Sequence, residues 1–347
     1  MSVPKPVMVL LDPSDACWIN FISSRENATI FHHPGWISAL SESYGYKGFI
    51  LAAVNASGEL IAGIPFMERR DFYHKKRWIS LPFTDHCVPL ANNEGSIDLL
   101  TRELIVIARE RQVSNIEMRW DYPAHSAIMK SSTFVLSKLD LHKDPADIAK
   151  RIKPKDFRNI DVAYKRGVQV KWGTGKEDLS LFYALHCETR RRLGVPVQPW
   201  KFFSRLYNSI IQKGKGFVLL AHRDNKYLAA ALFLHGGKTL VYKYSASSKE
   251  ANRFLAIDPI IWTAICWGCQ RGFQWMDFGR TETKNLGLRS FKRRWGAEEI
   301  PLIYSVLPST PPHPALGRLT KIMHHVIPRS PLWVCRLIGE LLYGHFG

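Results

Sequence analysis

Two stretches of this chain are nearly identical, KGFIL at residues 47–51 and KGFVL at residues 215–219. Each begins an apolar strand, and in each case a polar turn and a second apolar strand follow. Similarity that continues over corresponding elements indicates an internal repeat, with a chance resemblance as the alternative. The repeat predicts two copies of one structural pattern in the chain.

Each copy continues with an aromatic strand, a loop, a helix and a closing strand. The expected helices are residues 97–110 and 259–271, and the expected closing strands are residues 115–120 and 273–278. An antiparallel meander followed by a helix and a further strand is typical of α+β or mixed α/β domains. We therefore expect an α/β (α+β) protein with two duplicated domains, each a mixed, mainly antiparallel sheet flanked by helices.

Helices are also expected before each copy, at residues 34–43 before the first and at residues 144–166 and 179–193 before the second. Asp144 precedes a proline, as the N-cap of a helix often does, and Gly167 has the position of a C-terminal stop. These signals predict a domain boundary near residue 143.

Three parts of the chain follow from this boundary. Residues 1–142 form the first module and residues 143–308 the second. Residues 309–347 are expected to form a Pro-rich linker and an amphipathic C-terminal tail, because three prolines precede a segment with apolar residues along one side, namely Trp333, Leu337, Leu341 and Leu342. Such a helix either lies on a membrane surface or docks on the second module.

The charge balance restricts the class of partner. The chain has 48 Lys and Arg against 30 Asp and Glu, a net charge of +18, which attracts phosphates, nucleic acid or an anionic membrane surface. No nucleic-acid-reading module is recognisable, so specific DNA binding is not expected. Six scattered cysteines and a short N-terminal apolar run favour a cytoplasmic location, with peripheral contact to the inner membrane through residues 311–347 as an option.

Several familiar sites are excluded or disfavoured. The pair Cys266 and Cys269 has no second ligand pair, so core packing is favoured over a metal or redox site, and no metal is expected. No phosphate-binding P-loop and no serine-hydrolase motif occur. Residues 191–196 are superficially similar to a coenzyme A loop, but Pro196 removes a backbone donor that such a loop needs.

Basic residues gather in the second half of the chain, in three clusters that include Arg158, Arg190 and Arg280. Guanidinium groups bind phosphates in a bidentate manner, so these three arginines are candidates for holding a phosphate-containing donor. A solvated basic surface is the alternative.

The stretch WMDFGRTETKNLGLRSFKRRWG at residues 275–296 contains an apolar strand, then a polar loop, then a segment in which apolar residues occur again. Loops at strand ends commonly carry function. Asp277 ends the strand, Asn285 lies in the loop, and Lys292 is flanked by apolar neighbours that can direct it into a cleft. In the alternative, Asp277 caps the loop and Lys292 is a surface charge.

With these residues the chain resembles the FemAB family of aminoacyl-tRNA-dependent transferases and its BioF2-like relatives. The resemblance covers about residues 31–305. It rests on the order and spacing of six stretches, which are FHHPGW at 31–36, LPFTD at 81–85, KDFRNI at 155–160, TRRRLGVP at 189–196, DFGR at 277–280 and FKRRWG at 291–296.

The resemblance implies a tandem of two N-acetyltransferase-type (GNAT) folds and transfer of an acyl or aminoacyl group to an amine. Lys292 matches the family's donor-channel lysine, and Asp85 matches the region that lines the acceptor cleft. Trp36 in the first stretch and Asn285 in the loop are further candidates for substrate or donor contact. The sequence after Asp85, however, departs from the pattern of the cross-bridge enzymes, and no coiled-coil arm is present.

The expected reaction is attack of an acceptor amine on an activated carbonyl. Lys292 and backbone amides would stabilise the oxyanion, and Asp85 or Asp277 could accept the amine proton. The donor, an aminoacyl-tRNA or an acyl thioester, would be a co-substrate and not a bound cofactor. We expect a role in cell-envelope or exopolysaccharide biosynthesis, with an acceptor that can be lipid-linked. The alternatives are an acyl-thioester-dependent N-acyltransferase of lipid or small-molecule metabolism and a non-catalytic membrane-associated scaffold.

Overall fold

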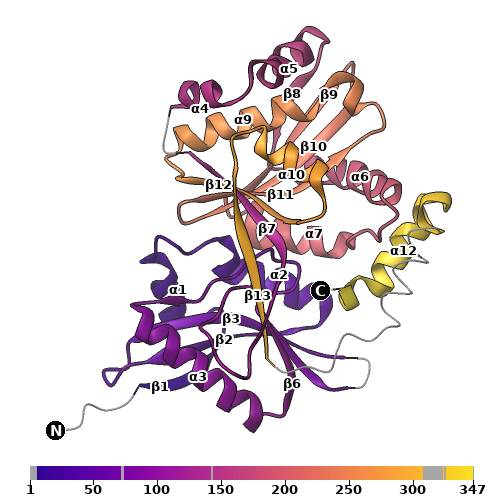
Figure 1. The fold of residues 1–347 in the computed structure, drawn as a ribbon. Helices are drawn as coiled ribbons and strands as arrows, with labels where there is room; N and C mark the ends of the chain where they lie inside the picture. Colours follow the sequence, from indigo (N-terminus) through magenta and orange to yellow (C-terminus); the bar gives the residue numbers. More distant parts are fainter. Residues whose placement is uncertain (1–5, 72–73, 142–143, 308–322, 324–325, 347) are drawn as a thin grey trace. The chain divides into compact units, whose positions relative to one another are not determined.

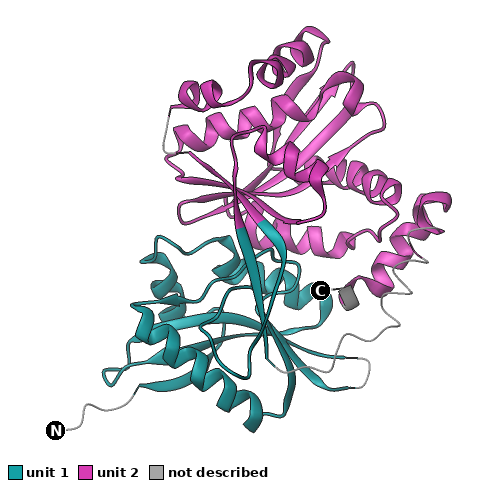
Figure 2. Ribbon diagram, viewed as in Figure 1, with its two compact units in different colours: residues 1–135, 301–311 teal, residues 136–300, 312–347 magenta. Residues whose placement is uncertain are grey.

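The computed structural model describes residues 6–71, 74–141, 144–307, 323 and 326–346. The chain forms two compact units (Figure 2). Unit 1 contains residues 1–135 and 301–311, and unit 2 contains residues 136–300 and 312–347. The predicted limits at 142/143 and 308/309 fall largely on residues outside this description, as does most of the predicted Pro-rich linker.

Unit 1 is built on a mixed sheet in the order β1-β2-β3-β4-β6-β13, with the short β5 beside β3 (Figure 1). The pairs from β1 to β4 are antiparallel, whereas β4 and β6 are parallel. Its elements are β1 (Val7–Leu11), α1 (Ala16–Ser23), η1 (Ile30–His32), α2 (Pro34–Tyr44), β2 (Lys47–Val54), β3 (Leu60–Arg70), β4 (Lys76–Ile79), β5 (Leu90–Ala91), α3 (Glu94–Glu110), β6 (Val113–Met118) and part of β13 (Glu298–Leu307).

Unit 2 contains a sheet in the order β8-β9-β10-β11-β12-β7. The pairs from β8 to β11 are antiparallel, and β11 and β12 are parallel. Its strands are β7 (Met129–Asp140, in part), β8 (Gln169–Gly173), β9 (Gly216–Arg223), β10 (Lys226–Gly236), β11 (Thr239–Ser247) and β12 (Trp275–Glu282). Its helices are α4 (Pro145–Arg151), α5 (Pro154–Lys165), α6 (Lys176–Arg192), α7 (Trp200–Leu206), η2 (Tyr207–Ile211), α8 (Ala251–Phe254), α9 (Ile257–Gln270), α10 (Leu286–Arg293), η3 (Ile327–Arg329), α12 (Leu332–Leu342) and η4 (Tyr343–Phe346).

The predicted duplication is confirmed element by element. In each unit three antiparallel pairings are followed by a helix and then by a strand parallel to its neighbour. The two similar pentapeptides begin corresponding strands, since β2 starts at Lys47 and β9 at Gly216. The fold class expected from the sequence is therefore correct.

Two strands belong to both units. Along the chain, β7 passes from unit 1 into unit 2 after Val135, and β13 passes from unit 2 into unit 1 after Ile300. In unit 1, β13 pairs antiparallel with β6, with Ser305 opposite Met118. Unit 1 thus takes its last strand from a segment that follows nearly all of unit 2 in the sequence.

The core of unit 2 lies on both faces of its sheet. On β9, Phe217 and Leu219 belong to a buried cluster with Ile260 of α9, whereas the alternate residues Val218 and Leu220 are also buried but lie outside that cluster. Successive side chains of a strand point to opposite faces. Helices α5 and α9 contact each other and cover the first face, and α6 contacts β9, β10 and β11 on the second.

The predicted single helix at residues 144–166 is wrong, because the chain forms two helices there, α4 and α5. Pro154 begins α5, and the residue before a proline is disfavoured in the helical region, so Lys153 is extended, with ψ 135°. The predicted N-cap is present, since the Asp144 carboxylate accepts a hydrogen bond from the Ala146 amide at 2.7 Å. Gly167 follows α5 with a positive φ of 79°, as expected of a helix stop.

Candidate functional site

Strands β11 and β12 of unit 2 pair over only part of their length. Their parallel register consists of three pairs and ends with Val241 opposite Asp277. Both strands then continue, β11 to Ser247 and β12 to Glu282. Beyond Val241 and Asp277, the backbone N–H and C=O groups on the facing edges of β11 and β12 do not pair with each other. A ligand with peptide-like polar groups can bind to these edges.

A β-bulge lies on β11 at the point of divergence. In the pairing with β10, Leu232 faces Tyr244 and Phe233 faces Tyr242, so Lys243 is the extra residue. A bulge leaves one residue unpaired and redirects its neighbours, which is why bulges are frequent next to active sites. The Tyr242 ring meets the Phe278 ring of β12 edge-on, with centroids 5.7 Å apart.

Asp277 and Gly279 shape β12 beyond the last pair. The buried Asp277 carboxylate accepts a hydrogen bond from the Gly279 amide at 2.7 Å, and Gly279 has a positive φ of 72°. A residue with a side chain rarely adopts such a φ, so this position favours glycine. Farther along β12, the hydroxyl of Thr281 is buried and has no hydrogen-bond partner within the described residues.

Lys292 of α10 reaches this part of β12. Its side chain is only 3% exposed, and its ammonium donates hydrogen bonds to the carbonyl oxygens of Gly279 at 2.7 Å and Arg280 at 3.1 Å. The neighbour Trp295 is fully buried in the core of unit 2, as the sequence predicted for the residues that direct Lys292 inward. Lys292 is thus a buried cation beside the divergent strands and not a surface charge.

The three predicted phosphate-binding arginines lie at different places in unit 2. Arg158 is exposed on α5, a helix that lies with α9 over the first face of the unit 2 sheet. Arg190 is on α6, on the other face, and its Nε donates a hydrogen bond to the Pro196 carbonyl at 3.1 Å. Arg280 is half-buried on β12. Of these three arginines, the structure brings only Arg280 close to Lys292. The ammonium of Lys292 donates a hydrogen bond to the backbone carbonyl oxygen of Arg280.

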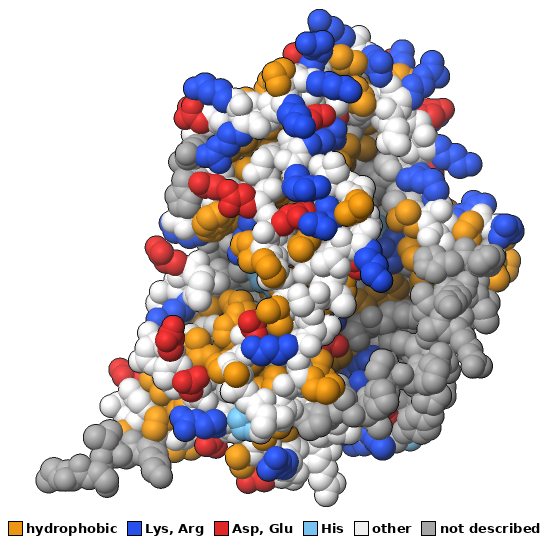
Figure 3. Space-filling model, viewed as in Figure 1, with side chains coloured by type: hydrophobic (Ala, Val, Ile, Leu, Met, Phe, Trp, Pro, Cys, Tyr) orange, Lys and Arg blue, Asp and Glu red, His pale blue; other side chains and the backbone are white. Residues whose placement is uncertain are grey.

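Asn285 has a capping role in the structure. It is exposed, and its side-chain oxygen accepts a hydrogen bond from the Leu288 amide at 3.1 Å at the start of α10. The surrounding surface of unit 2 carries many Lys and Arg side chains, especially over α4 and α5 (Figure 3).

In unit 1, the predicted residues Trp36 and Asp85 belong to one hydrogen-bonded cluster. The fully buried Trp36 indole donates to the Thr84 hydroxyl at 2.8 Å. The Asp85 carbonyl accepts a hydrogen bond from the Tyr304 hydroxyl at 2.5 Å, and the Thr84 carbonyl accepts one from the Arg119 guanidinium at 2.6 Å. Burial lowers the pKa of Arg119, but Glu117, Tyr304 and Asp85 outweigh it and raise the pKa above its ordinary value.

The loop that contains Asp85 is strained. Leu81 and Phe83 have positive φ values of 66° and 58°, which non-glycine residues rarely adopt. Such conformations persist where surrounding contacts enforce them, and they are concentrated at functional sites. In this loop, the hydrogen bonds from Trp36 and Arg119 both hold Thr84, the residue after Phe83.

Sequence reasoning missed several members of both clusters, namely Tyr242, Lys243, Tyr244 and Thr281 in unit 2 and Arg119 and Tyr304 in unit 1. The alternation YKY was visible as an aromatic strand, but a bulge depends on pairing with β10. Tyr304 is separated from Asp85 by 219 positions, so no local pattern could join them.

Cys266 and Cys269 of α9 are half-buried free thiols, and Cys269 packs against the core of unit 2. Burial raises the pKa of Cys269 to about 11, which disfavours the thiolate that redox and metal chemistry require. No group of three or more metal-binding side chains occurs in the part of the chain that the structure describes.

Comparison with known proteins finds a family model that matches part of the chain. Residues 155–293 match the model of the acetyltransferase (GNAT) domain. A lipid II:glycine glycyltransferase from Staphylococcus aureus is 32% identical over 81 residues, which is 22% of this chain and 19% of that protein. The chain therefore spans about a fifth of the length of the curated relatives it matches.

Solved structures extend the similarity of fold to most of the chain. FemX superposes with a TM-score of 0.70 at 15% identity, over 86% of this chain and 96% of that one. L-PGS from Bacillus licheniformis gives a TM-score of 0.57 at 14% identity, over 92% of this chain and 99% of that one. The fold class and the resemblance predicted from the sequence are thus confirmed.

Proposed function

We propose that this FemAB-like protein, with two units of the GNAT type, transfers an acyl or aminoacyl group from an activated donor to an amine. The observation that carries the proposal is the divergence of β11 and β12 beyond Val241 and Asp277, with a bulge on one side and the buried cation of Lys292 on the other. An acyl chain with amide groups would lie along the unpaired strand edges, where backbone donors and acceptors can bind it.

In the proposed reaction the amine nitrogen attacks the donor carbonyl carbon. The new C–N bond forms, and the tetrahedral intermediate collapses as the bond to the ester oxygen or thioester sulfur breaks. The amine loses one proton and the leaving group gains one, either directly or through a carboxylate, for which Asp277 and Asp85 remain the candidates. No covalent bond to the protein is needed.

Lys292 would supply positive charge where the oxyanion develops. A buried ammonium in a site of low dielectric interacts strongly with a nearby anion and needs little reorganisation. Its hydrogen bonds to the carbonyls of Gly279 and Arg280 fix its position on β12. It can therefore act on the oxyanion itself or hold the strand edge that binds the donor.

An aminoacyl ester is the donor that we favour. The first turn of α9 carries Asp258, a buried carboxylate that forms an ion pair with Arg294. The N-terminus of a helix attracts anions, but a carboxylate already there disfavours a pyrophosphate such as that of coenzyme A. Arg280, beside Lys292, and the more distant Arg158 and Arg190 would instead contact donor phosphates.

The acceptor would bind at the unit 1 cluster around Asp85. Trp36 would hold the neighbouring Thr84 in place through its hydrogen bond. The lipid II:glycine glycyltransferase that the chain partly matches suggests an acceptor of cell-envelope type, and such an acceptor can be lipid-linked. We propose a cytoplasmic location for the reaction. None of the described helices is long and apolar enough to cross a membrane.

Peripheral membrane contact through α12 is part of the proposal. Trp333, Leu337 and Leu341 are 65%, 49% and 68% exposed and lie four residues apart, so they form one apolar stripe on the helix. An amphipathic helix on a strongly basic protein favours an anionic bilayer surface, although Glu340 lies beside the stripe.

The transfer reaction is tested by incubating the protein with labelled aminoacyl-tRNA or acyl thioesters in the presence of amines. We expect consumption of an aminoacyl donor, reduced roughly 10²–10³-fold in Lys292→Ala, as for the loss of one oxyanion donor. Arg293→Gln, an exposed neighbour on the same helix, is the matched control and should retain activity. Circular dichroism establishes that both variants are folded.

The alternatives give different outcomes. Consumption of acyl thioesters alone would support an N-acyltransferase of lipid or small-molecule metabolism. If the wild-type protein consumes neither class of donor, the non-catalytic scaffold replaces the enzyme. Unchanged turnover in a folded Lys292→Ala variant would remove Lys292 from the mechanism.

A further inference from the structure

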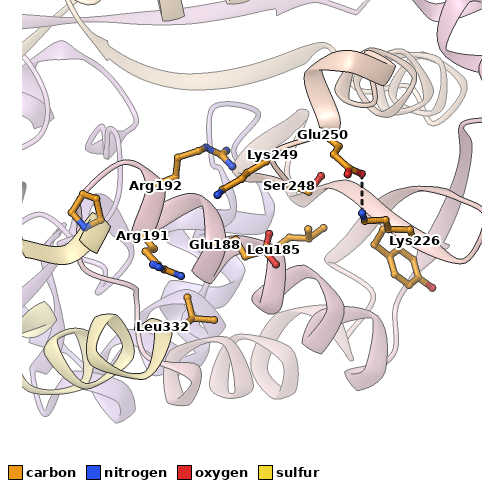
Figure 4. A pocket seen from close by; sticks show the side chains of 11 residues that line it. Leu185, Glu188, Arg191, Arg192, Lys226, Ser248, Lys249, Glu250 and Leu332 are labelled. Carbon is orange, nitrogen blue, oxygen red and sulfur yellow. Dashed lines mark ion pairs between the residues drawn. The ribbon is translucent and has the colours of Figure 1, made fainter. Parts of the chain in front are cut away.

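A cavity of about 800 Å³ lies in unit 2, and the transfer proposal uses none of its lining residues. It is lined by the C-terminal part of α6, the start of β10, residues 248–250 after β11, and two residues from the C-terminal region, Pro328 and Leu332 (Figure 4). The cavity thus combines parts of the GNAT-type fold with a segment that follows it.

The charged side chains of this cavity leave an excess of positive charge. Four cations, Arg191, Arg192, Lys226 and Lys249, line it together with two carboxylates, Glu188 and Glu250. Lys226 is paired with Glu250 at 2.8 Å. The Arg192 guanidinium donates to the carbonyl and the hydroxyl of Ser247, at 3.0 and 2.9 Å. Hydrogen bonds to these neutral groups do not cancel the charge of Arg192, so the four cations exceed the two carboxylates by two charges.

Two polar atoms of the cavity lining are buried without a partner. Nε of Arg191 and Oγ of Ser248 make no hydrogen bond within the described residues. An unpaired buried donor costs free energy, which an incoming acceptor oxygen would recover. A guanidinium, a hydroxyl and the nearby ammonium of Lys249 together suit a tetrahedral oxyanion such as phosphate.

Three residues of the lining are apolar, namely Leu185 of α6, Pro328 and Leu332. Leu332 is the first residue of α12, which packs against residues 195–197: Cys335 Sγ lies 3.7 Å from the Val195 carbonyl oxygen, and Gly339 fits closely against Val197. An apolar wall of this kind contributes to binding of hydrocarbon but gives little to an ion alone.

We propose that this cavity binds the phosphate group of an amphiphile, a lipid phosphate ester. The phosphate would contact Arg191, Ser248 and Lys249, and the start of the hydrocarbon part would lie along Leu185, Pro328 and Leu332. A ribose-phosphate chain would match the cations but not the apolar wall, which is why we favour a lipid. The site goes beyond the transfer reaction and is measured without any acyl donor.

The test is isothermal titration calorimetry with dioctanoyl phosphatidic acid, with inorganic phosphate and dioctanoylglycerol as separate probes. We expect the double variant Arg191→Gln/Lys249→Gln to bind the phosphatidic acid about tenfold more weakly or worse, since it loses charged hydrogen bonds. Lys201→Gln/Lys213→Gln removes the same charge from exposed positions outside the cavity and should bind as the wild type does. Leu332→Gln should weaken phosphatidic acid but not inorganic phosphate.

Several results would overturn the proposal. These are absence of binding to the wild type, equal losses in the two double variants, and inorganic phosphate binding as tightly as phosphatidic acid. A short RNA that binds more tightly than the lipid and loses affinity in the cavity variants would assign the site to RNA. Thermal unfolding shows whether each variant is folded, and none of these outcomes depends on transferase activity.

Discussion

Two histidines are buried in places where they cannot easily carry a charge. His32 in unit 1 is 1% exposed, and burial lowers its pKa to about 4 despite a hydrogen-bonding contact of 2.8 Å with the Val88 carbonyl. His186 in unit 2 is surrounded by rings, including Phe182 and Tyr244, and burial, with Arg190 nearby, lowers its pKa to about 3. Both are neutral in the folded protein at pH 7.

These shifts predict that the protein loses stability in mild acid. The unfolded chain binds protons near pH 6.5, above the pKa of either folded histidine, so the stabilisation is present above pH 6.5 and is lost as the pH falls toward 4 for His32 and 3 for His186. The free energy of unfolding should fall by at most about 1.4 kcal/mol per pH unit for each histidine. Urea unfolding at several pH values measures this slope.

His186→Leu is the informative variant, because neither ring nitrogen of His186 has a hydrogen-bond partner within the described residues. The slope between pH 6 and 4 should become shallower in the variant. An unchanged slope would mean that His186 does not contribute to the acid sensitivity.

Residue types at the candidate site were partly predictable from the sequence. The inward direction of Lys292 follows from its apolar neighbours, and the capping of Gly279 by Asp277 was foreseen only as an alternative. That the Arg119 side chain reaches the Thr84 carbonyl depends on the packing of β6 against a distant loop, which no local pattern records.

At the scale of elements, α12 is attached to unit 2 through a glycine contact. A Cβ added at Gly339 would lie 1.9 Å from the Val197 carbonyl oxygen, far inside van der Waals contact. Gly339→Val should therefore separate α12 from its place beside α6 while leaving the rest of unit 2 intact. Limited proteolysis and hydrogen exchange of residues 332–342 measure this change.

Glu340→Ala is the control for Gly339→Val, because Glu340 is exposed on the same helix. Protection of α12 should persist in the control. If Gly339→Val retains full protection as well, the contact with Val197 does not determine the position of the helix.

Elements with strong periodicity were predicted well, and their interruptions were not. Helix α3 was expected at residues 97–110 and occurs at Glu94–Glu110. The break between α4 and α5 has a local signal in Pro154, whereas the bulge at Lys243 has none, because a bulge is a property of two paired strands.

At the scale of the whole molecule, the shared strands predict the result of dividing the chain. A fragment of residues 1–142 lacks β13, the Tyr304 hydroxyl that binds the Asp85 carbonyl, and the Ser305 hydroxyl that accepts from the Tyr122 amide at 3.0 Å. It should fail to unfold cooperatively in thermal denaturation followed by circular dichroism. The intact chain is the reference, and a cooperative transition of the fragment would contradict the prediction.

The sequence indicated the duplication but not that β13, which follows unit 2 in the sequence, completes the sheet of unit 1. Both copies have the same linear pattern whichever sheet the last strand joins. Register and neighbour order are set by pairing between distant residues, such as Ser305 with Met118. Linear boundaries therefore cannot describe units that are discontinuous in the chain.

The late position of β13 also orders events during synthesis on the ribosome. Residues 136–300 of unit 2 are translated before the strand that completes unit 1. The N-terminal strands must then wait, with the edge of β6 unpaired, until residues 301–307 leave the exit tunnel. Nascent chains thus expose a sheet edge while residues 119–300 are synthesised, which gives chaperones a defined segment to protect.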